Sequence, residues 1–359
     1  MILEKIYLAN FRKHTYFELS FDPLVTAIVG TNGTGKSSLI EAIRYLSTGR
    51  SYRGCYDKEI VNWNQDQFTL RAEFSGSELE SIGIKYNQQA VTSSKKTVYL
   101  DNRPLQRLSE LQGIFPTVLH HPEQFEILLG GPAQRRELID FLLCQTETDY
   151  LDNLKIYQRA LNQRNSLLKK ASGDSLLFDQ YETQLAGSAE KIQTIRSQML
   201  QELEPLLQDE VERLGKDLLE PLQLSYKSGL SEDRPVADQF KAERRRGLQR
   251  GYTTIGIQRD DWQLLNHRGQ RFKDFASRGE LKVILLALKL AEIRYMGEII
   301  GKNPLFLADD FMAELDRSRQ LYTLDRVKQL GIQFVFSAVN YRPLEPVARV
   351  IPIGDQTDD

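Results

Sequence analysis

The chain has 359 residues, of which 41% are hydrophobic and 27% are charged, and its formal net charge at pH 7 is −2. This composition is typical of a globular protein, and the charge excludes a uniformly basic protein, so any contact with nucleic acid requires a local basic surface. No apolar stretch is long enough to cross a bilayer, and the first residues lack the apolar core of a signal peptide. Because Cys55 and Cys144 stand far apart, without a C-x-x-C pair, we expect a cytoplasmic protein and no zinc module.

The start of the chain predicts two strands joined by a short turn. Apolar residues alternate over 2–8 and again over 17–21, which is the period of a strand with one buried face. Residues 10–14, N-F-R-K-H, form a polar and basic turn between them.

A strand, a glycine-rich loop and a helix are predicted in direct succession over residues 24–46. Residues 24–29 are apolar or β-branched, and residues 39–46 carry apolar side chains at helical spacing. The loop between them reads G-x-x-x-x-G-K-S, a pattern whose backbone N–H groups surround phosphates at the start of a helix. We expect Lys36 to reach the β- and γ-phosphates and Ser37 to ligate Mg²⁺. The candidate nucleotide ligands are Gly30, Thr31, Asn32, Gly33, Thr34, Gly35, Lys36, Ser37 and Ser38.

The middle of the chain changes from strand to helix patterning. Residues 68–100 alternate in the manner of an antiparallel β wing, and leucines recur every seven residues over 154–168. The same spacing recurs over 185–206, after a Ser/Gly/Asp break at 172–175, and predicts two helices packed as a short antiparallel arm. We therefore expect residues 1–125 and 226–359 to form the two parts of a nucleotide-binding head, with a helical lobe at 126–225.

The last third predicts a buried strand at 304–308 that ends in two carboxylates, Asp309 and Asp310. In a phosphate-loop protein the first carboxylate belongs beside Mg²⁺, and the second suits a general base that orients the attacking water. The alternative is that both acids only cap the following turn.

An amphipathic helix is predicted over about 278–300, and it is preceded by Ser277. A serine and a glycine at a helix start are typical of an N-cap, but the same geometry presents donors to an anion. Because a phosphate loop is already present, we expect a composite site, in which Ser277 of one subunit closes over ATP held by another.

The motifs occur in a characteristic order. The phosphate loop at 30–37, S-R-G-E at 277–280, the Asp pair and A-E-L-D at 313–316 resemble, in this order, the ABC-type ATPase heads of the SMC/Rad50 group. More narrowly, the chain resembles the RecF family of bacterial DNA replication and repair proteins, over essentially its whole length. The stretches that support this are N-F-R at 10–12, G-R-S-Y-R at 49–53, H-P-E-Q-F-E-I-L-L-G-G-P-A-Q-R-R at 121–136, R-D-D at 259–261, F-A-S-R-G-E-L-K at 275–282 and D-D-F-M-A-E-L-D at 309–316.

This resemblance implies an α/β fold, namely a P-loop NTPase of ABC-ATPase type with an antiparallel β wing and an inserted α-helical lobe. It implies a homodimer formed by ATP and Mg²⁺, slow DNA-stimulated hydrolysis, and action with RecO and RecR at single-strand gaps and ss/ds junctions. There RecA would replace single-strand binding protein during DNA repair, replication restart and SOS induction. The roles that it implies are catalysis for Lys36 and Asp310, metal binding for Ser37 and Asp309, nucleotide binding for Arg12 and Arg53, contact with the partner's γ-phosphate for Ser277 and Gly279, and a place across the dimer seam for Asp316.

The sequence also departs from the family pattern. Glu280 stands where the signature motif usually has Gln, and Ala308 stands where a larger aliphatic residue is expected. Gly-Ile-Gln at 256–258 stands where the family has Gly-Pro-His. Ser337 and Ala338 stand where related ATPases carry a switch His. We therefore expect weak turnover. Glu123 and Gln124 are candidates for the glutamine loop.

Two basic clusters are candidates for DNA contact. The first comprises Lys155, Arg159, Arg164, Lys169 and Lys170, and the second comprises Lys241, Arg244, Arg245, Arg246 and Arg250. Such contacts would be independent of sequence and sensitive to salt, but a charge run is usually only a solvated face. Two alternatives to a DNA-binding ATPase are the motor subunit of a transporter and a chromosome-structuring or nuclease-coupled scaffold. The short arm speaks against both, and the absence of a C-x-x-C hook speaks against the scaffold.

Overall fold

The computed structural model describes residues 1–90, 94–171, 174–215, 221–339 and 348–354. The chain divides into two compact units, the first comprising Met1–Gln124 with Leu286–Asp359 and the second comprising Phe125–Leu285. The second unit is thus an insertion in the sequence of the first. Within the described residues, no helix has the length and apolar composition needed to cross a bilayer.

The first unit contains a six-stranded antiparallel sheet. In spatial order its strands are β2 (His14–Ser20), β1 (Ile2–Phe11), β4 (Gln67–Ser75), β5 (Ser81–Asn87), β6 (Lys96–Leu100) and β7 (Arg103–Pro104). In β4, the buried side chains of Phe68, Leu70, Ala72 and Phe74 alternate with less buried ones, because successive side chains of a strand point to opposite faces. The predicted antiparallel wing is therefore confirmed.

The second sheet of this unit is parallel and five-stranded. Its spatial order is β13 (Arg349–Pro352), β3 (Val25–Val29), β12 (Phe334–Ala338), β11 (Leu305–Ala308) and β8 (Thr117–His120). Parallel strands have their carboxyl ends at one edge, where open α/β sheets bind ligands. This edge therefore brings together the glycine-rich loop after β3 and the Asp pair after β11.

Helix α1 (Lys36–Thr48) packs against strands of both sheets in the first unit. Its side chains Leu39, Ile40, Ile43 and Leu46 are buried in the main hydrophobic core, as their helical spacing predicts. The helix ends at Gly49, whose positive φ of 67° closes the last turn. The glycine-rich loop is therefore attached to a rigidly packed helix.

The remaining helices of the first unit are short, apart from a long one that begins in the second unit. They are α2 (Asp57–Ile60), α9 (Phe311–Glu314), α10 (Arg317–Gln329) and the C-terminal part of α8 (Arg278–Ile300). The predicted helix over 278–300 is confirmed.

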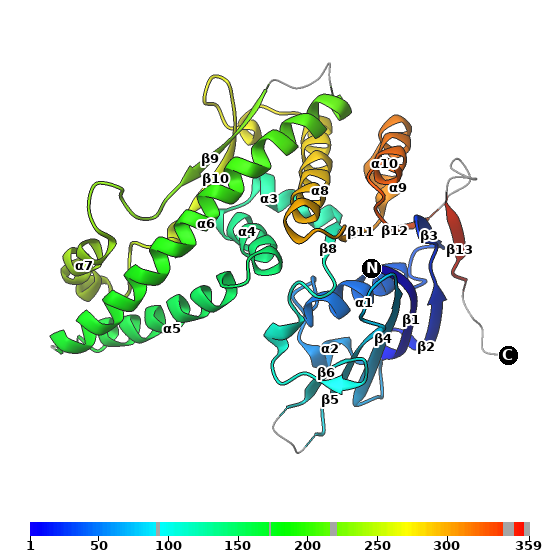
Figure 1. Cartoon of the computed structure of the whole chain (residues 1–359), viewed down its shortest axis with the longest axis horizontal. Coiled ribbons are helices and arrows are strands. Elements are labelled where there is room, and N and C mark those ends of the chain that lie inside the picture. The colour runs from blue at the N-terminus through cyan, green and yellow to red at the C-terminus, as the bar shows by residue number, and fades with distance from the viewer. Residues whose placement is uncertain (91–93, 172–173, 216–220, 340–347, 355–359) are drawn as a thin grey trace. The chain divides into compact units, whose positions relative to one another are not determined.

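The second unit is mainly helical. Its helices are α3 (Phe125–Leu129), α4 (Pro132–Thr146), α5 (Tyr150–Lys169), α6 (Ser175–Gly215) and α7 (Val236–Arg250), and a two-stranded sheet pairs β9 (Leu222–Lys227) with β10 (Asp261–Asn266). The predicted arm is confirmed: α5 and α6 run side by side, with α7 packed against both (Figure 1). The seven-residue seams are largely buried, as at Leu161 and Ile192. Residues 172 and 173 of the predicted break lie outside the described residues.

The interior of the arm contains a network of charged side chains. Arg164 on α5 is fully buried and forms ion pairs with Glu182 on α6 (3.1 Å) and Glu243 on α7 (3.0 Å). Arg244 on α7 also pairs with Glu182, at 2.5 Å, and with Asp179, at 2.6 Å. Three of the ten cations predicted as DNA contacts are therefore paired with acids, since Lys155 also pairs with Asp152 (3.2 Å), and Arg164 has no access to solvent.

The outer edge of β9 is covered by side chains of α6. Glu204 accepts a hydrogen bond from the N–H of Leu224 (2.6 Å), and Gln208 accepts one from the N–H of Leu222 (2.9 Å). The two acceptors are four residues apart and lie on one face of the helix, so they match alternate N–H groups of the strand.

The contacts place one boundary differently from the sequence-based division. Residues 226–285 were expected in the head, but they group with the helical unit. The physical reason is that α7 packs on α5 and α6, and β10 pairs with β9. The lobe therefore extends to Leu285.

Candidate nucleotide-binding site

The glycine-rich loop connects β3 to α1 and leaves its N–H groups available. Gly33 and Gly35 have φ angles of 86° and 95°, a left-handed region that side-chain-bearing residues rarely adopt. A Cβ on Gly30 would lie 2.3 Å from the carbonyl oxygen of Ile353. Within the described residues, the N–H groups of Gly33, Gly35, Lys36 and Ser37 donate no hydrogen bond. The loop thus has unused N–H groups at a helix start, which is the geometry that binds anions in other proteins.

Lys36 lies across this loop. Its ammonium donates hydrogen bonds to the carbonyl oxygens of Gly30 (2.7 Å) and Thr31 (2.8 Å). Burial lowers the pKa of Lys36, while the nearby carboxylates of Asp310 and Asp309 oppose that shift. The amine therefore points into the loop, among the groups that were predicted to bind phosphate.

The Asp pair lies after β11, and Asp309 is held on both oxygens. Ser337 on β12 donates to Oδ1 at 2.6 Å, and Tyr52 donates to Oδ2 at 3.1 Å. The Ser337 hydroxyl also accepts a hydrogen bond from the N–H of Asp310 (2.8 Å), which has a left-handed φ of 54°. Ser337 stands at the position where a switch His was missing, and it orders both acids.

Arg12 and Arg53 converge on one buried carboxylate, that of Glu41 on α1. Arg12 makes two hydrogen bonds to Glu41, of 2.9 and 2.6 Å, and Arg53 lies 3.9 Å from it and 3.8 Å from Asp309. Although burial opposes it, the hydrogen bond with Glu41 raises the pKa of Arg12, so its guanidinium stays charged. Ser51 donates to the same carboxylate.

These groups line one cavity of about 940 Å³ in the first unit, a volume within the range of small-molecule sites. The predicted residues that line it are Arg12, Asn32, Gly33, Gly35, Lys36, Ser37, Ser38, Arg53, Glu123, Asp309 and Asp310. Of the two glutamine-loop candidates, Glu123 lines the cavity, whereas Gln124 accepts a hydrogen bond from the N–H of His121.

Several lining residues were not singled out from the sequence. Tyr52 and His121 pack ring against ring, with centroids 5.0 Å apart. Burial, together with the charge of Lys289, lowers the pKa of His121 to about 4, so the imidazole is neutral at physiological pH. Tyr52 and His121 lie inside stretches that carry the family resemblance, so the sequence contains a signal for them. No local pattern indicates that Ser337 reaches Asp309, and only the fold shows this contact.

The signature stretch begins α8 in the second unit, where Ser277 and Gly279 are exposed. Glu280 accepts a hydrogen bond from the N–H of Ser277 (2.7 Å), and the Ser277 hydroxyl accepts one from the N–H of Glu280 (3.2 Å). This is a capping box, so the carboxylate of Glu280 turns back onto the helix start. Asp316 caps α10 in a similar way, through the N–H of Arg319.

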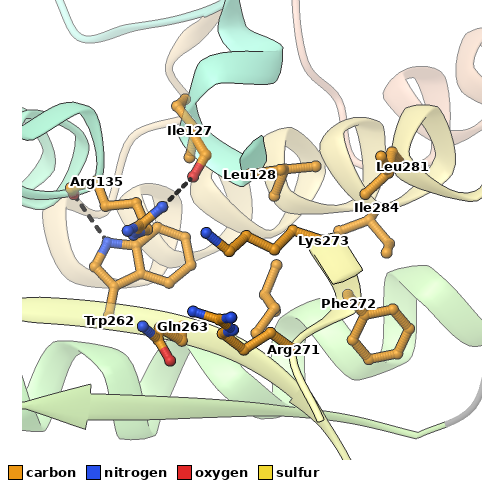
Figure 2. A pocket seen from close by; sticks show the side chains of 11 residues that line it. Ile127, Leu128, Arg135, Trp262, Gln263, Arg271, Phe272, Lys273, Leu281 and Ile284 are labelled. Carbon is orange, nitrogen blue, oxygen red and sulfur yellow. Dashed lines mark hydrogen bonds between the residues drawn. The ribbon is translucent and has the colours of Figure 1, made fainter. Parts of the chain in front are cut away.

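The second unit has a small cavity of about 20 Å³, which Figure 2 shows from close by. Beside it, Arg135 forms an ion pair with Asp261 (2.7 Å), and the indole of Trp262 donates to the carbonyl oxygen of Arg135 (2.8 Å). Arg196 binds Asp260 in the same unit, at 2.6 Å. The P-A-Q-R-R and R-D-D stretches of the sequence therefore form a structural network within the helical unit.

The comparisons with known proteins agree with this architecture. The model of the RecF/RecN/SMC N terminal domain matches residues 2–358. The DNA replication and repair protein RecF of Lachnoclostridium phytofermentans is 31% identical over 338 residues, which are 93% of this chain and 92% of the relative. RecF of Moorella thermoacetica is 35% identical over 325 residues, or 89% of this chain and 85% of the relative.

A solved structure of the recombination mediator protein RecF with ATP, in the RecFOR pathway, is 29% identical. It superposes with a TM-score of 0.86 over 96% of this chain and 93% of that one. The two sheets and the inserted helical unit thus define the head of an ABC-type ATPase of the SMC class. Within that class, the chain belongs to the RecF family.

Proposed function

We propose that this chain is an ATP-dependent DNA-binding recombination mediator. It acts in the cytoplasm with RecO and RecR at single-strand gaps and ss/ds junctions, where it promotes RecA loading. Its membership of the RecF family supports this, as does the relative that was solved with ATP. The observation that carries the proposal is the cradle of unused N–H groups, with Lys36 across it and Asp309 in the same cavity.

The loop and Lys36 bind the phosphates of ATP. The N–H groups of Gly33, Gly35, Lys36 and Ser37 donate to phosphate oxygens, and the positive end of α1 favours the same charge. Lys36 exchanges its bonds with the loop carbonyls for stronger, charge-assisted bonds to phosphate. Arg12 and Arg53, fixed by Glu41, complete the positive lining.

Ser37 and Asp309 hold Mg²⁺, for which hydroxyl and carboxylate oxygens are suitable ligands. When bound, the metal neutralises charge on the β- and γ-phosphates. Tyr52 and Ser337 fix the carboxylate of Asp309 in one orientation. Asp310, whose N–H is tied to Ser337, orients the attacking water as general base.

Ser277 and Gly279 act on the γ-phosphate bound by a second copy of the chain. In the capping box the Ser277 oxygen accepts a hydrogen bond, so its own proton stays available for donation to phosphate. The carboxylate of Glu280 is engaged by the N–H of Ser277, which removes the objection to an acid in the signature motif. ATP thus joins two copies, and slow, DNA-stimulated hydrolysis releases them.

The test is sedimentation of the full chain with and without ATP and Mg²⁺, with gapped duplex as a further condition. The unsubstituted protein shifts from monomer to dimer with ATP. Ser277→Arg abolishes the shift but retains ATP binding, because Ser277 acts on the partner's nucleotide, whereas Lys36→Met loses ATP binding.

Thr183→Arg, which adds the same charge on the exposed face of α6, serves as the matched control and dimerises normally. If Ser277→Arg dimerises with ATP as the unsubstituted chain does, the composite site is wrong. If Lys36→Met still binds ATP tightly, the phosphate cradle is misassigned.

A further inference from the structure

Cations near the end of α5 differ in whether an acid neutralises them. Arg164 and Arg244 are neutralised by acids of the arm, and Lys155 is paired with Asp152. Other exposed cations of the same region form no ion pair with any described residue; they are Arg159, Lys169, Lys170, Lys241, Arg245, Arg246 and Arg250. Since the whole chain has a net charge of −2, this concentration of unpaired positive charge is a local property.

Four of these cations come from segments that pack against each other. A Cβ on Gly247 of α7 would lie 3.0 Å from Leu168 of α5, and one on Gly251 would lie 3.8 Å from Cγ of Lys169. The end of α5 therefore runs beside the last turn of α7. We define the α5–α7 basic patch as Lys169, Lys170, Arg246 and Arg250.

The patch has a rigid support. Phe240 of α7 is fully buried, and its carbonyl oxygen accepts a hydrogen bond from Arg164 (3.0 Å). Gln239 donates to the carbonyl oxygens of Ser231 (2.7 Å) and Arg234 (3.0 Å), which fixes the start of the helix. Because the interior face of α7 is anchored, the backbone positions from which Arg246 and Arg250 extend are fixed.

The sequence of α7 increases the local repulsion. Arg246 and Arg250 are four residues apart, so they are neighbours on one face, and like charges at this spacing destabilise a helix. The described acid nearest to them in sequence, Glu243, is buried and paired with Arg164. A polyanion would supply the missing counter-charge.

We propose that the α5–α7 basic patch binds the phosphate backbone of duplex DNA without reading its sequence. This rests on the proposed function, in which the chain binds DNA, and it names the surface involved. The duplex is favoured over a single strand because single-strand sites use free, exposed stacking rings. The aromatic residues of α5 and α7, namely Tyr150, Tyr157 and Phe240, are buried, and the exposed ring of Tyr252 after α7 already lies under the guanidinium of Arg259, 6.0 Å from the ring centroid. Helix α7 has 15 residues and spans about 22 Å. A duplex carries a charge about every 1.7 Å along its axis, so a duplex that lies along α7 presents several phosphates to its cations.

The test measures affinity of the full chain, with ATP and Mg²⁺, for a labelled duplex at several salt concentrations. Arg246→Ala/Arg250→Ala lowers affinity about equally for unrelated sequences, and it reduces the slope of log K against log salt by about 1.8, or about 0.9 per lost phosphate contact. Arg246→Lys/Arg250→Lys keeps most of the affinity, since Lys also serves as a point charge for phosphate. Lys191→Ala/Lys227→Ala, with the same charge change at exposed positions of α6 and β9, binds as the unsubstituted protein does.

The outcomes separate the two proposals. If the unsubstituted protein binds no DNA, the proposed function fails and this inference fails with it. If it binds DNA and Arg246→Ala/Arg250→Ala binds with the same affinity and salt slope, only the α5–α7 basic patch is wrong. If a single strand displaces the duplex and Tyr252→Ala, which removes the exposed ring after α7, weakens binding more than the double variant does, base stacking replaces the backbone contact and overturns the inference.

Discussion

Two buried glutamates, one in each unit, each lie beside two arginines, but the arginines differ in whether they are exposed to a cavity. Glu41 in the first unit and Glu182 in the second are both wholly buried, and each carboxylate holds two arginines. The arginines of Glu41 are Arg12 and Arg53, whose side chains are 18% and 36% exposed and line the cavity. Of the arginines of Glu182, Arg164 is 0% exposed, and Arg244, which is 22% exposed, is also paired with Asp179 (2.6 Å).

The difference shows that an ion pair gains its role from what surrounds it. In the first unit, a buried acid aims two cations at a cavity that is open to a ligand. In the second unit, a similar acid joins α5, α6 and α7, and its arginine Arg164 faces only protein. The positive charges of the arginines beside Glu41 thus face a cavity and can contact a ligand, whereas the charge of Arg164 beside Glu182 contacts only other residues of the helical unit.

The largest expected effect is a loss of stability of the helical unit when Arg164, the buried partner of Glu182, is removed. Arg164→Ala leaves Glu182 and Glu243 buried with fewer partners, and removing one partner of a buried ion pair costs about 3–5 kcal/mol of stability. Urea unfolding of the full chain, with the helical unit followed by hydrogen exchange, measures this loss. Arg246→Ala, an exposed change on α7, should stay within about 0.5 kcal/mol; equal losses for the two variants would mean that the network does not stabilise the arm.

The second effect concerns acid pH and the first unit. The pKa of His121 is lowered from 6.5 to about 4, so the folded state binds fewer protons than the unfolded state between these values. Stability from this group is therefore complete above about pH 6.5 and is lost as the pH falls towards 4, by up to about 3 kcal/mol. Unfolding of the unsubstituted chain and of His121→Gln across this range measures the difference; parallel pH profiles would contradict a neutral, buried imidazole.

The third effect concerns the acids of the nucleotide site. Ser337→Ala removes the donor to Asp309 and the acceptor for the N–H of Asp310, and hydrogen bonds to charged groups are worth about 1.5–3 kcal/mol. ATP turnover should fall at least about tenfold, while ATP binding persists because the loop and Lys36 are untouched. Tyr52→Phe, which loses only the longer bond of 3.1 Å, should reduce turnover less. A normal rate for Ser337→Ala would show that Asp309 needs no such support.

The smallest effect is expected at Glu280. Glu280→Gln preserves the capping box, since a glutamine side chain accepts the same bond from the N–H of Ser277. Stability should change by less than about 0.5 kcal/mol, and ATP-dependent dimerisation should be unaltered. A marked gain in dimerisation would instead mean that the carboxylate of Glu280 repels the partner's nucleotide.

The sequence predicts which residues line the cavity of the candidate nucleotide site better than it predicts which cations are exposed, for a physical reason. The loop from Gly30 to Ser37 is contiguous, and its glycines restrict the backbone to few conformations, so spacing alone identifies it. The Asp pair ends a strand whose apolar run is visible. Ser337, by contrast, lies far along the chain from Asp309 and reaches it only because β12 pairs with β11.

The arm shows what charge patterns alone do not reveal. Arg159 and Arg164 lie on the same predicted helix, but only the packing of α6 and α7 shows that Arg164 is buried. The boundary of the lobe was displaced for the same reason, since residues 226–285 resemble a return to an α/β head in sequence yet pack on the arm. Long-range contacts, which a local pattern does not contain, decide both.

The covered edge of β9 has a consequence for handling the protein at high concentration. An open strand edge recruits strands of other molecules and starts aggregation. Here Glu204 and Gln208 occupy two of the N–H groups that a foreign strand would need. Association of copies through this strand is thereby disfavoured, so concentrated solutions of the protein should resist irreversible, fibre-like assembly at this edge.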